Sequence, residues 1–277
     1  MNLISAEVKE LQEKAKAIRV DIVQSLSEAG SGHLGGSLGL ADLFSALYFK
    51  ILNHRPQMPN WECRDRLVLS IGHVAPVLYT SLAHAGYFPK EELKTLRKLG
   101  SRLQGHPGRD HQLPGLELSA GSLGQGLSVA VGMALTARHD KQSWKTYCVL
   151  GDGELQEGSV WEAAMSAAHY KLDNLVAIVD RNYVQIDGKT EDVMALEPLA
   201  GKWEAFGWHV LLCNGNNIEE LLSAFEQANN IKNKPVVLLA NTKMGAGVKS
   251  IENDNAWHGK APSKEQAGSF IKEITEA

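Results

Sequence analysis

Residues 147–188, near the middle of the chain, have the pattern of a strand, a tight turn, a helix and a second strand. The apolar run 147–150 stops at Gly-Asp-Gly, which is typical of a buried parallel strand followed by a turn. Small and apolar residues three and four positions apart then predict a helix with a slim apolar face, and a second apolar run covers 175–179. A right-handed crossover of this kind makes the two strands parallel, so their carboxyl ends lie at the same edge of a sheet.

Two polar side chains follow these strand ends. Asp152 comes after the first strand and Asn182 after the second, so we expect them to converge. A carboxylate, a carboxamide oxygen and a backbone carbonyl from the turn after Asn182 supply half of the octahedral shell that Mg²⁺ prefers. Gly151 and Gly153 let a diphosphate approach the backbone where the helix begins. The pattern predicts a metal and diphosphate site, but Gly-Asp-Gly by itself also fits a plain turn, with Asn182 an ordinary loop residue.

This arrangement resembles thiamine diphosphate enzymes, in which Gly-Asp-Gly is followed by an Asn at the end of the next strand. The segments GDGELQEGSVWEAA (151–164) and KLDNLVAIVDRN (171–182) closely resemble transketolases, and the resemblance covers almost the whole chain. It implies thiamine diphosphate as the cofactor, with Mg²⁺, or Ca²⁺ or Mn²⁺ in its place, as the metal. The residues that it assigns to the metal are Asp152, Asn182 and, through its main-chain oxygen, Val184; those that it places against the cofactor here are Gly153 and Ile186.

Histidines occur in several glycine-bordered loops, where each can present an imidazole to a ligand. His33 lies in SGHLGGSLG, which we expect to form a flexible loop over 31–39, although His33 alone also fits a loop residue without a role. His73 lies at a strand end, a common position for ligand contact in open α/β sheets. His106 lies in the irregular stretch 100–118, which has no core to build and is therefore expected to line a site.

These loops have counterparts in transketolases. SGHLG resembles their SGHPG loop, with Leu34 in place of proline, and GHPG resembles their GHPE, with Gly108 in place of the acid. The segment KMGAGVKSIENDNAWHGKAP (243–262) resembles the loop that closes over the cofactor and ends in His-Gly. The histidines that the resemblance places at the substrate are His33, His73, His106 and His258, of which His73 and His258 also lie near the cofactor.

A further glycine-rich segment, GSLGQG, has GxxGxG spacing and is a weak dinucleotide fingerprint. It resembles the GPLGQG of transketolases, with Ser122 in place of proline, and the resemblance implies that backbone groups of Gly121 and Leu123 meet the aminopyrimidine of the cofactor. The small-residue helix 128–134 allows close packing against a second copy of the chain. Lys243 ends a strand beside glycines, and is either a cation for the diphosphate or substrate phosphate or an ordinary solvated lysine.

Strands and helices alternate along the rest of the chain. The alternation predicts an α/β fold with a doubly wound, mostly parallel sheet flanked by helices, in a single domain over 1–277. The expected helices cover 6–29, 40–52, 90–99, 197–206, 218–228 and 263–277, and the expected further strands cover 66–70, 208–213 and 235–240.

Composition excludes several classes of protein. The net charge of −4 argues against nucleic acid or an anionic membrane as the main partner. No apolar run reaches the length of about eighteen residues that a membrane span needs, and the N-terminus reads as a charged amphipathic helix, so we expect a cytoplasmic protein. The three cysteines form no CxxC pair, which argues against a zinc ribbon or a disulfide scaffold.

Metal and diphosphate groups position the cofactor, but activation requires a glutamate hydrogen-bonded to its aminopyrimidine. In full-length transketolases this glutamate lies in a second, pyrimidine-binding domain of the opposite subunit. No residue follows Ala277, so we expect that domain and the C-terminal domain on a separate chain, in an α2β2 assembly. The resemblance directs Glu157 across the dimer toward that glutamate, where a shared proton would couple the two sites. An acid at this position would also favour the start of the following helix.

Together these inferences predict the N-terminal subunit of a two-chain transketolase. Such an enzyme transfers a two-carbon ketol unit from a ketose donor to an aldose acceptor through a thiamine diphosphate adduct. The sugars stay open, and include pentose phosphates, branched sugar phosphates and sulfosugars. One alternative is a subunit of a deoxyxylulose-phosphate synthase or dehydrogenase E1 type, which would share Gly-Asp-Gly and Asn but not GHPG, LQEG and WHG. Another is a non-catalytic subunit that binds the cofactor.

Overall fold

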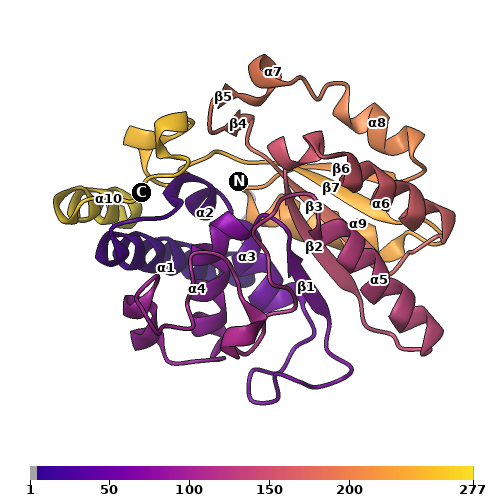
Figure 1. The fold of residues 1–277 in the computed structure, drawn as a ribbon, viewed down its shortest axis with the longest axis horizontal. Coiled ribbons are helices and arrows are strands. Elements are labelled where there is room, and N and C mark those ends of the chain that lie inside the picture. The colour runs from indigo at the N-terminus through magenta and orange to yellow at the C-terminus, as the bar shows by residue number, and fades with distance from the viewer. Residues whose placement is uncertain (1–4, 277) are drawn as a thin grey trace.

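The computed structural model describes residues 5–276, and a five-stranded parallel sheet forms the centre of the molecule (Figure 1). Its strand order is β1-β2-β3-β7-β6, and each neighbouring pair is parallel. The predicted α/β class with a parallel sheet is confirmed. The strands are β1 (Arg66–Leu69), β2 (Thr146–Gly151), β3 (Leu175–Arg181), β6 (His209–Asn214) and β7 (Val236–Asn241), and a separate antiparallel ribbon pairs β4 (Val184–Gln185) with β5 (Gly188–Lys189).

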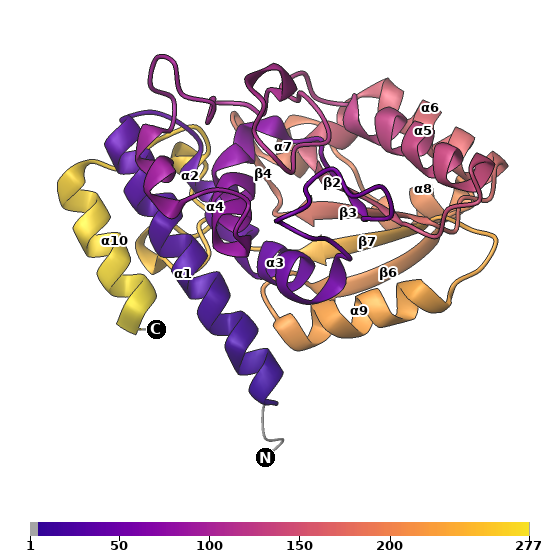
Figure 2. The ribbon, with the colours of Figure 1, turned by 90° about the horizontal axis from the view of Figure 1, so that it is seen from below.

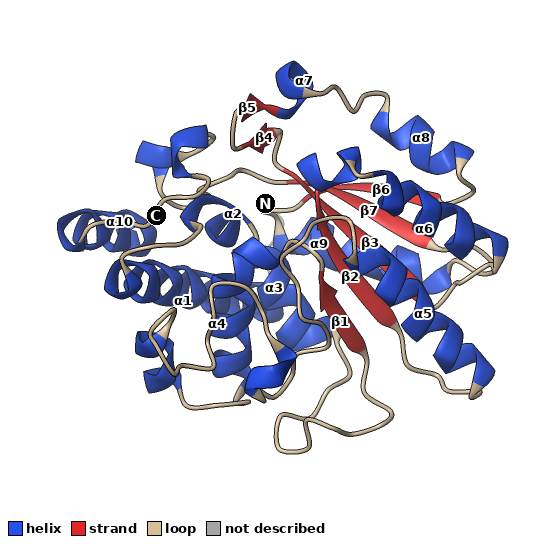
Figure 3. Ribbon diagram, viewed as in Figure 1, coloured by secondary structure: helices blue, strands red, loops and turns tan. Residues whose placement is uncertain are grey.

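Helices cover both faces of the sheet (Figure 3). Figure 2 shows α5 and α6 on one side of the strands and α9 on the other. Among residues 5–276, no helix is both long enough and apolar enough to span a membrane. The α-helices are α1 (Ala6–Ala29), α2 (Leu34–Gly39), α3 (Ala41–Ala46), α4 (Ala75–Ala85), α5 (Gly126–His139), α6 (Gly158–His169), α7 (Thr190–Val193), α8 (Leu199–Ala205), α9 (Ile218–Asn230) and α10 (Lys264–Glu276). Short 3₁₀ helices cover Gly72–Val74, Lys90–Thr95, Arg109–His111, Gly153–Gln156, Lys249–Ile251 and Asn255–Trp257.

The central strands are buried on both faces and divide the core in two. In β2, Tyr147 and Val149 pack with α1 to α4 and α9, whereas Cys148 and Leu150 pack with α5, α6 and α8. Because side chains alternate along a strand and helices cover both faces, such a strand reads as a continuous apolar run. Full burial of each large apolar side chain contributes about 1.5–3 kcal/mol. The well-packed strands therefore hold the residues at their carboxyl ends in fixed positions.

The register of the two central strands brings the predicted ligands to the same edge of the sheet. Gly151 of β2 lies opposite Asp180 of β3, and the backbone N–H of Asp152 donates to the Asp180 carbonyl at 3.2 Å. Asp152 follows the last residue of β2 and Asn182 follows the last residue of β3, so both lie at the same edge of the sheet. The crossover geometry predicted from the sequence is confirmed.

The segment 31–39 differs from the flexible loop that we expected. Leu34–Gly39 forms the buried helix α2, and Leu34 and Leu38 have no exposed surface. The glycines allow this helix to approach a neighbouring segment, since a Cβ at Gly35 would lie 2.7 Å from Met244 Cγ and one at Gly39 would lie 2.8 Å from the Lys243 carbonyl oxygen. The glycines that suggested flexibility are thus explained by close packing.

Two further helix predictions need correction. The expected helix 90–99 is only the 3₁₀ helix Lys90–Thr95, and Leu93 and Leu96 pack into the core while the charged residues remain largely exposed. It ends where Arg97 takes a positive φ of 59° and its N–H donates to the Leu103 carbonyl at 2.8 Å. The expected helix over 40–52 is also interrupted, because α3 ends at Ala46 and a π-helical turn, Leu47–Ile51, follows.

Candidate functional site

A cavity of about 230 Å³ lies at the carboxyl edge of β2 and β3. It is lined by the Gly-Asp-Gly turn, by Asp180 and Asn182 at the end of β3, and by the ribbon that follows them. A larger groove of about 860 Å³ lies elsewhere, between α1, the 3₁₀ helix Lys90–Thr95 and α10. The residues that line it include charged side chains such as Glu28, Lys90 and Lys264. We place the site in the smaller cavity, because parallel sheets of this type bind ligands at their carboxyl edge.

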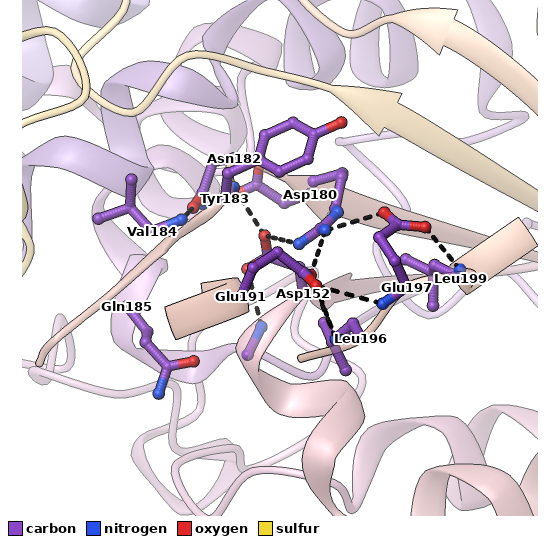
Figure 4. Close-up of polar contacts among 12 residues, drawn as sticks. Asp152, Asp180, Asn182, Tyr183, Val184, Gln185, Glu191, Leu196, Glu197 and Leu199 are labelled. Atoms are coloured by element: carbon purple, nitrogen blue, oxygen red, sulfur yellow. Dashed lines mark hydrogen bonds and ion pairs between the residues drawn. The ribbon is translucent and has the colours of Figure 1, made fainter. Parts of the chain in front are cut away.

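Asp152 is buried, and both of its carboxylate oxygens are held (Figure 4). Oδ1 accepts from the Gly153 N–H at 2.7 Å, and Oδ2 accepts from the Tyr183 N–H at 2.7 Å and from Arg181 Nη1 at 3.0 Å. Burial raises the pKa of Asp152, and the hydrogen bond from Tyr183 and the charge of Arg181 oppose this rise. The carboxylate is thus oriented before any ligand binds.

The amide of Asn182 is oriented by its neighbours. Nδ2 donates to Asp180 Oδ2 at 2.9 Å, so the oxygen Oδ1 faces the turn, where it accepts from the Val184 N–H at 2.9 Å. Asp180 also accepts from the Thr242 hydroxyl, and burial raises the pKa of Asp180 to about 7. The sequence singled out Asn182 but not Asp180, although its place two residues earlier on the same strand end was a usable signal.

This arrangement fits a divalent cation with a diphosphate. A carboxylate, an amide oxygen and the main chain of Val184 border one cavity, and all are hard oxygen donors. A Cβ at Gly153 would lie 3.3 Å from Gln185 Oε1, so a side chain there would fill the space next to the turn. Among residues 5–276, no group of three or more His, Cys, Asp or Glu side chains is arranged to hold a metal. Phosphate oxygens would therefore have to complete the metal shell.

The four predicted histidines lie together beside this cavity. The ring centroid of His33 lies 5.0 Å from that of His73, 5.8 Å from that of His258 and 6.3 Å from that of His106, and His73 and His258 are 5.2 Å apart. Burial, with the neighbouring imidazoles, lowers the pKa of His73 to about 3 and that of His33 to about 4. Burial also lowers the pKa of His106 and of His258. The cluster is neutral at pH 7, so each ring offers one donor and one acceptor nitrogen.

Comparison with known proteins identifies the family. A model of the transketolase thiamine diphosphate binding domain matches residues 10–274. The chain belongs to the transketolase family. The resemblance seen in the sequence is confirmed, and with it the expectation of a ketol-transferring enzyme that binds thiamine diphosphate.

Two relatives that are themselves single subunits of transketolases match along nearly their whole length. The apulose-4-phosphate transketolase subunit from Phocaeicola vulgatus is 43% identical over 270 residues, which cover 98% of this chain and 95% of that protein. The 6-deoxy-6-sulfo-D-fructose transketolase subunit from Clostridium sp. is 43% identical, with 98% of each chain covered.

Single-chain transketolases match only over part of their length. Human transketolase is 41% identical over 97% of this chain but only 42% of its own. The crystal structure of transketolase from Campylobacter jejuni superimposes with a TM-score of 0.89 at 37% identity, covering 100% of this chain and 43% of that one. The chain therefore corresponds to less than half of these relatives.

Some of the remaining residues predicted from the transketolase resemblance line the cavity, and others lie outside it. Leu123, Glu157 and Ile186 line it, and Gly121 lies beside the His106 ring. Glu157 is the N-cap of α6, but its exposed side chain makes no capping hydrogen bond. Lys243 is not among the lining residues, because its Nζ pairs with Glu252 Oε2 at 3.2 Å on the surface. This position favours the solvated-lysine alternative.

Several residues of the site were not predicted from the sequence. Glu154 is buried, and its carboxylate accepts from the Ser70 hydroxyl and from the N–H groups of Gly124 at 2.8 Å and Gly151 at 3.1 Å. It thereby ties the GSLGQG loop to the Gly-Asp-Gly turn. Its place directly after that turn was the only signal. Further lining side chains that the sequence did not single out are Gln156, Gln185 and Asp187.

Proposed function

We propose that this chain is the N-terminal subunit of a two-chain transketolase, which moves a two-carbon ketol unit from a ketose phosphate donor to an aldose phosphate acceptor. One observation carries the proposal. The oriented Asp152 and Asn182 border one cavity at the carboxyl edge of the sheet together with His73 and His258 of the neutral histidine cluster. The full-length match to two relatives named as transketolase subunits supports the division into two chains.

In this proposal the chain holds the diphosphate end of the cofactor. Asp152, Asn182 and the main-chain oxygen of Val184 bind Mg²⁺, for which Ca²⁺ or Mn²⁺ can substitute, and Gly153 leaves room for the diphosphate. Gly121, Leu123 and Ile186 border the rest of the cofactor. When bound, thiamine diphosphate supplies a nucleophilic carbon on its thiazolium ring.

The histidines handle the sugar. Because His33 and His73 are neutral at pH 7, each can donate one N–H to a substrate hydroxyl or carbonyl oxygen and accept a proton at its other nitrogen. His106 and His258 face the same cluster and can do likewise. Such groups orient a ketose and move protons at its hydroxyls when a carbon–carbon bond is made or broken.

A partner chain supplies the remaining parts of the site. A second chain with a pyrimidine-binding domain supplies the glutamate that activates the cofactor, in a cytoplasmic α2β2 assembly in which Glu157 faces that glutamate. The substrate is a ketose with a terminal anionic group, since the names of two relatives specify a phosphate and a sulfo sugar. The choice among pentose phosphates, branched sugar phosphates and sulfosugars depends on the partner.

Reconstitution tests this function. The chain is assayed for ketol transfer with Mg²⁺ and thiamine diphosphate, alone and after mixing with the partner subunit. Activity is expected only in the mixture, because the activating glutamate comes from the partner. His73→Gln should lower kcat in the mixture by at least about tenfold, in line with the loss of a group that transfers protons. A mixture that assembles and binds cofactor without ketol transfer would instead favour a non-catalytic cofactor-binding subunit.

A further inference from the structure

Arg181, the last residue of β3, is a buried cation beside a predicted metal ligand. Its side chain is 2% exposed and forms three ion pairs. Nη1 lies 3.0 Å from Asp152 Oδ2, whereas Nη2 lies 2.7 Å from Glu191 Oε1 and 3.0 Å from Glu197 Oε1. Figure 4 labels the three carboxylates that pair with this guanidinium, those of Asp152, Glu191 and Glu197. One cation therefore connects the metal site to a segment outside it.

We call residues 188–199 the cap segment; it contains β5, α7 and the start of α8. The two glutamates organise it. Glu191 also accepts from the backbone N–H groups of Leu196 at 3.2 Å and Glu197 at 3.4 Å, and Glu197 Oε2 accepts from the Leu199 N–H at 2.7 Å. In Figure 1 the cap segment runs along the outer edge of the molecule, past the carboxyl end of the sheet.

The cap segment has few apolar anchors of its own. Leu196 and Leu199 are buried, but Val193 and Met194 are exposed. The guanidinium stacks on the Tyr183 ring at 4.1 Å, and the Thr190 N–H donates to the Tyr183 carbonyl at 2.9 Å. Gln156 Nε2 also donates to the Met194 carbonyl at 2.9 Å and Lys202 Nζ to the Leu196 carbonyl at 2.6 Å. Arg181 is therefore one of several anchors of the cap segment, and the one that also contacts Asp152.

A divalent cation at Asp152 would share that carboxylate with Arg181. Two like charges a few ångströms apart repel each other, and a buried guanidinium keeps its charge at any accessible pH. The Gly153 and Tyr183 N–H groups already orient the Asp152 carboxylate, so Arg181 acts on the metal mainly through its charge. When a cation binds Asp152, the counter-ions left to Arg181 are Glu191 and Glu197.

We propose that Arg181 is a positioning residue that couples occupancy of the cation site to the order of the cap segment. Cation binding at Asp152 weakens the pair with Arg181 and strengthens its pairs with Glu191 and Glu197, which tightens the cap segment. This inference rests on the proposed function, since it assumes the metal site at Asp152. By linkage, the effect is reciprocal: whatever loosens Arg181 from Asp152 strengthens cation binding, and whatever strengthens that pair weakens it.

Two substitutions with opposite expected effects test the coupling. Arg181→Met keeps the apolar stem and removes the charge, so Mn²⁺ should bind in the presence of thiamine diphosphate about tenfold more tightly. The double substitution Glu191→Gln with Glu197→Gln leaves Asp152 as the only charged partner of Arg181, so Mn²⁺ should bind more weakly. A purely structural disturbance of the site would weaken binding in both variants. Electron paramagnetic resonance of free Mn²⁺ gives the dissociation constants for the full chain mixed with its partner subunit.

Hydrogen exchange provides the second measurement. In the unsubstituted chain the amides of Leu196, Glu197 and Leu199 should become several-fold more protected when Mn²⁺ and thiamine diphosphate bind. In Arg181→Met they should exchange faster at the start and no longer respond to the metal. Arg138→Met is the matched control. Arg138 donates to the Lys171 carbonyl at 3.1 Å, and within the described residues 5–276 it forms no hydrogen bond with the cap segment.

The outcomes separate this inference from the function on which it rests. If the unsubstituted chain, mixed with its partner subunit, binds no Mn²⁺ with thiamine diphosphate, the proposed metal site is wrong and the coupling is wrong with it. If that chain binds the metal but Arg181→Met binds it equally or more weakly, the coupling alone is refuted. A metal-dependent rise in cap-segment protection that persists in Arg181→Met also refutes it. Should Arg181→Met fail to fold, the double glutamine variant still decides, because unchanged or tighter binding there contradicts the proposal.

Discussion

The imidazole of His73 stays neutral at neutral pH because burial lowers its pKa to about 3. In the unfolded chain an imidazole has a pKa of about 6.5. Between these values the unfolded state binds more protons than the folded state, so the free energy of unfolding falls as the pH drops through this window. From pH 7.5 to pH 5.5 we expect His73 to account for a loss of about 1.4 kcal/mol.

Urea denaturation at the two pH values measures this loss. His73→Gln should make the loss smaller by about 1.4 kcal/mol, since glutamine does not titrate. His139→Gln removes an imidazole whose side chain is 88% exposed at the end of α5, and serves as the matched control. Equal losses in the unsubstituted chain and in His73→Gln would show that burial does not hold this ring neutral.

Individual site residues could be predicted where the sequence places them directly after a recognisable strand. Asp152 and Asn182 each follow an apolar run, and His73 follows a strand, so the parallel topology alone brings them to one edge. Asp180 and Arg181 were not singled out, because within the run they read as the plain end of a strand. The place of Asp180 two residues before Asn182 was a usable signal. The contacts of Arg181 depend on which side chains the fold brings against it, and no spacing in the sequence encodes that.

Helix α2 shows that glycines can be required by close packing between elements and not by a flexible loop. The glycines in 34–39 predicted a flexible loop, but they are needed because α2 lies against the chain at residues 243–244. At Gly39 a Cβ would approach the Lys243 carbonyl oxygen to 2.8 Å, and a backbone atom cannot turn away as a side chain can. The neighbouring residue His33 precedes this helix, so α2 also fixes one imidazole of the cluster.

We therefore expect Gly39→Ala to lower the free energy of unfolding by about 1–3 kcal/mol, the usual cost of overpacking a buried contact. Gly268→Ala in α10 is the matched control, since a Cβ there meets nothing within 4 Å. It should raise the free energy of unfolding by about 0.5–1 kcal/mol, because alanine favours a helix over glycine. Chemical denaturation of both variants measures the two effects. Equal signs would contradict the close contact at Gly39.

Among the elements, those with strong local signals were predicted best. Helix α1 was expected over 6–29 and forms over Ala6–Ala29, because Ser5 caps its start and Gly30 takes the left-handed conformation at its end. The 3₁₀ helix Lys90–Thr95 was expected to be longer, because its charge pattern resembles that of a solvated helix. Its actual end is set by the bond between Arg97 and Leu103, a contact across a loop that no local pattern predicts.

In the molecule as a whole, the packed sheet supports the polar groups of the cofactor site. The two cores on either face of the sheet hold β2 and β3, and several chain segments then contribute to one cavity at their carboxyl edge. Asp152 is the only carboxylate in the proposed metal set, and its neighbour Arg181 is positively charged. A bare divalent cation is therefore held weakly, and the diphosphate has to supply the remaining oxygens and negative charge.

It follows that Mg²⁺ and thiamine diphosphate should stabilise the chain only together. At a free cofactor concentration one hundred times its dissociation constant the expected gain is about 2.7 kcal/mol, which raises the thermal midpoint, whereas Mg²⁺ alone should leave the midpoint unchanged. Asp152→Asn should remove the gain, because an amide in place of the carboxylate takes the only charged ligand from the metal. Asp140→Asn, at an exposed residue just after α5 and away from the cavity, should retain it. A gain in Asp152→Asn as large as that in the unsubstituted chain would place the cation elsewhere.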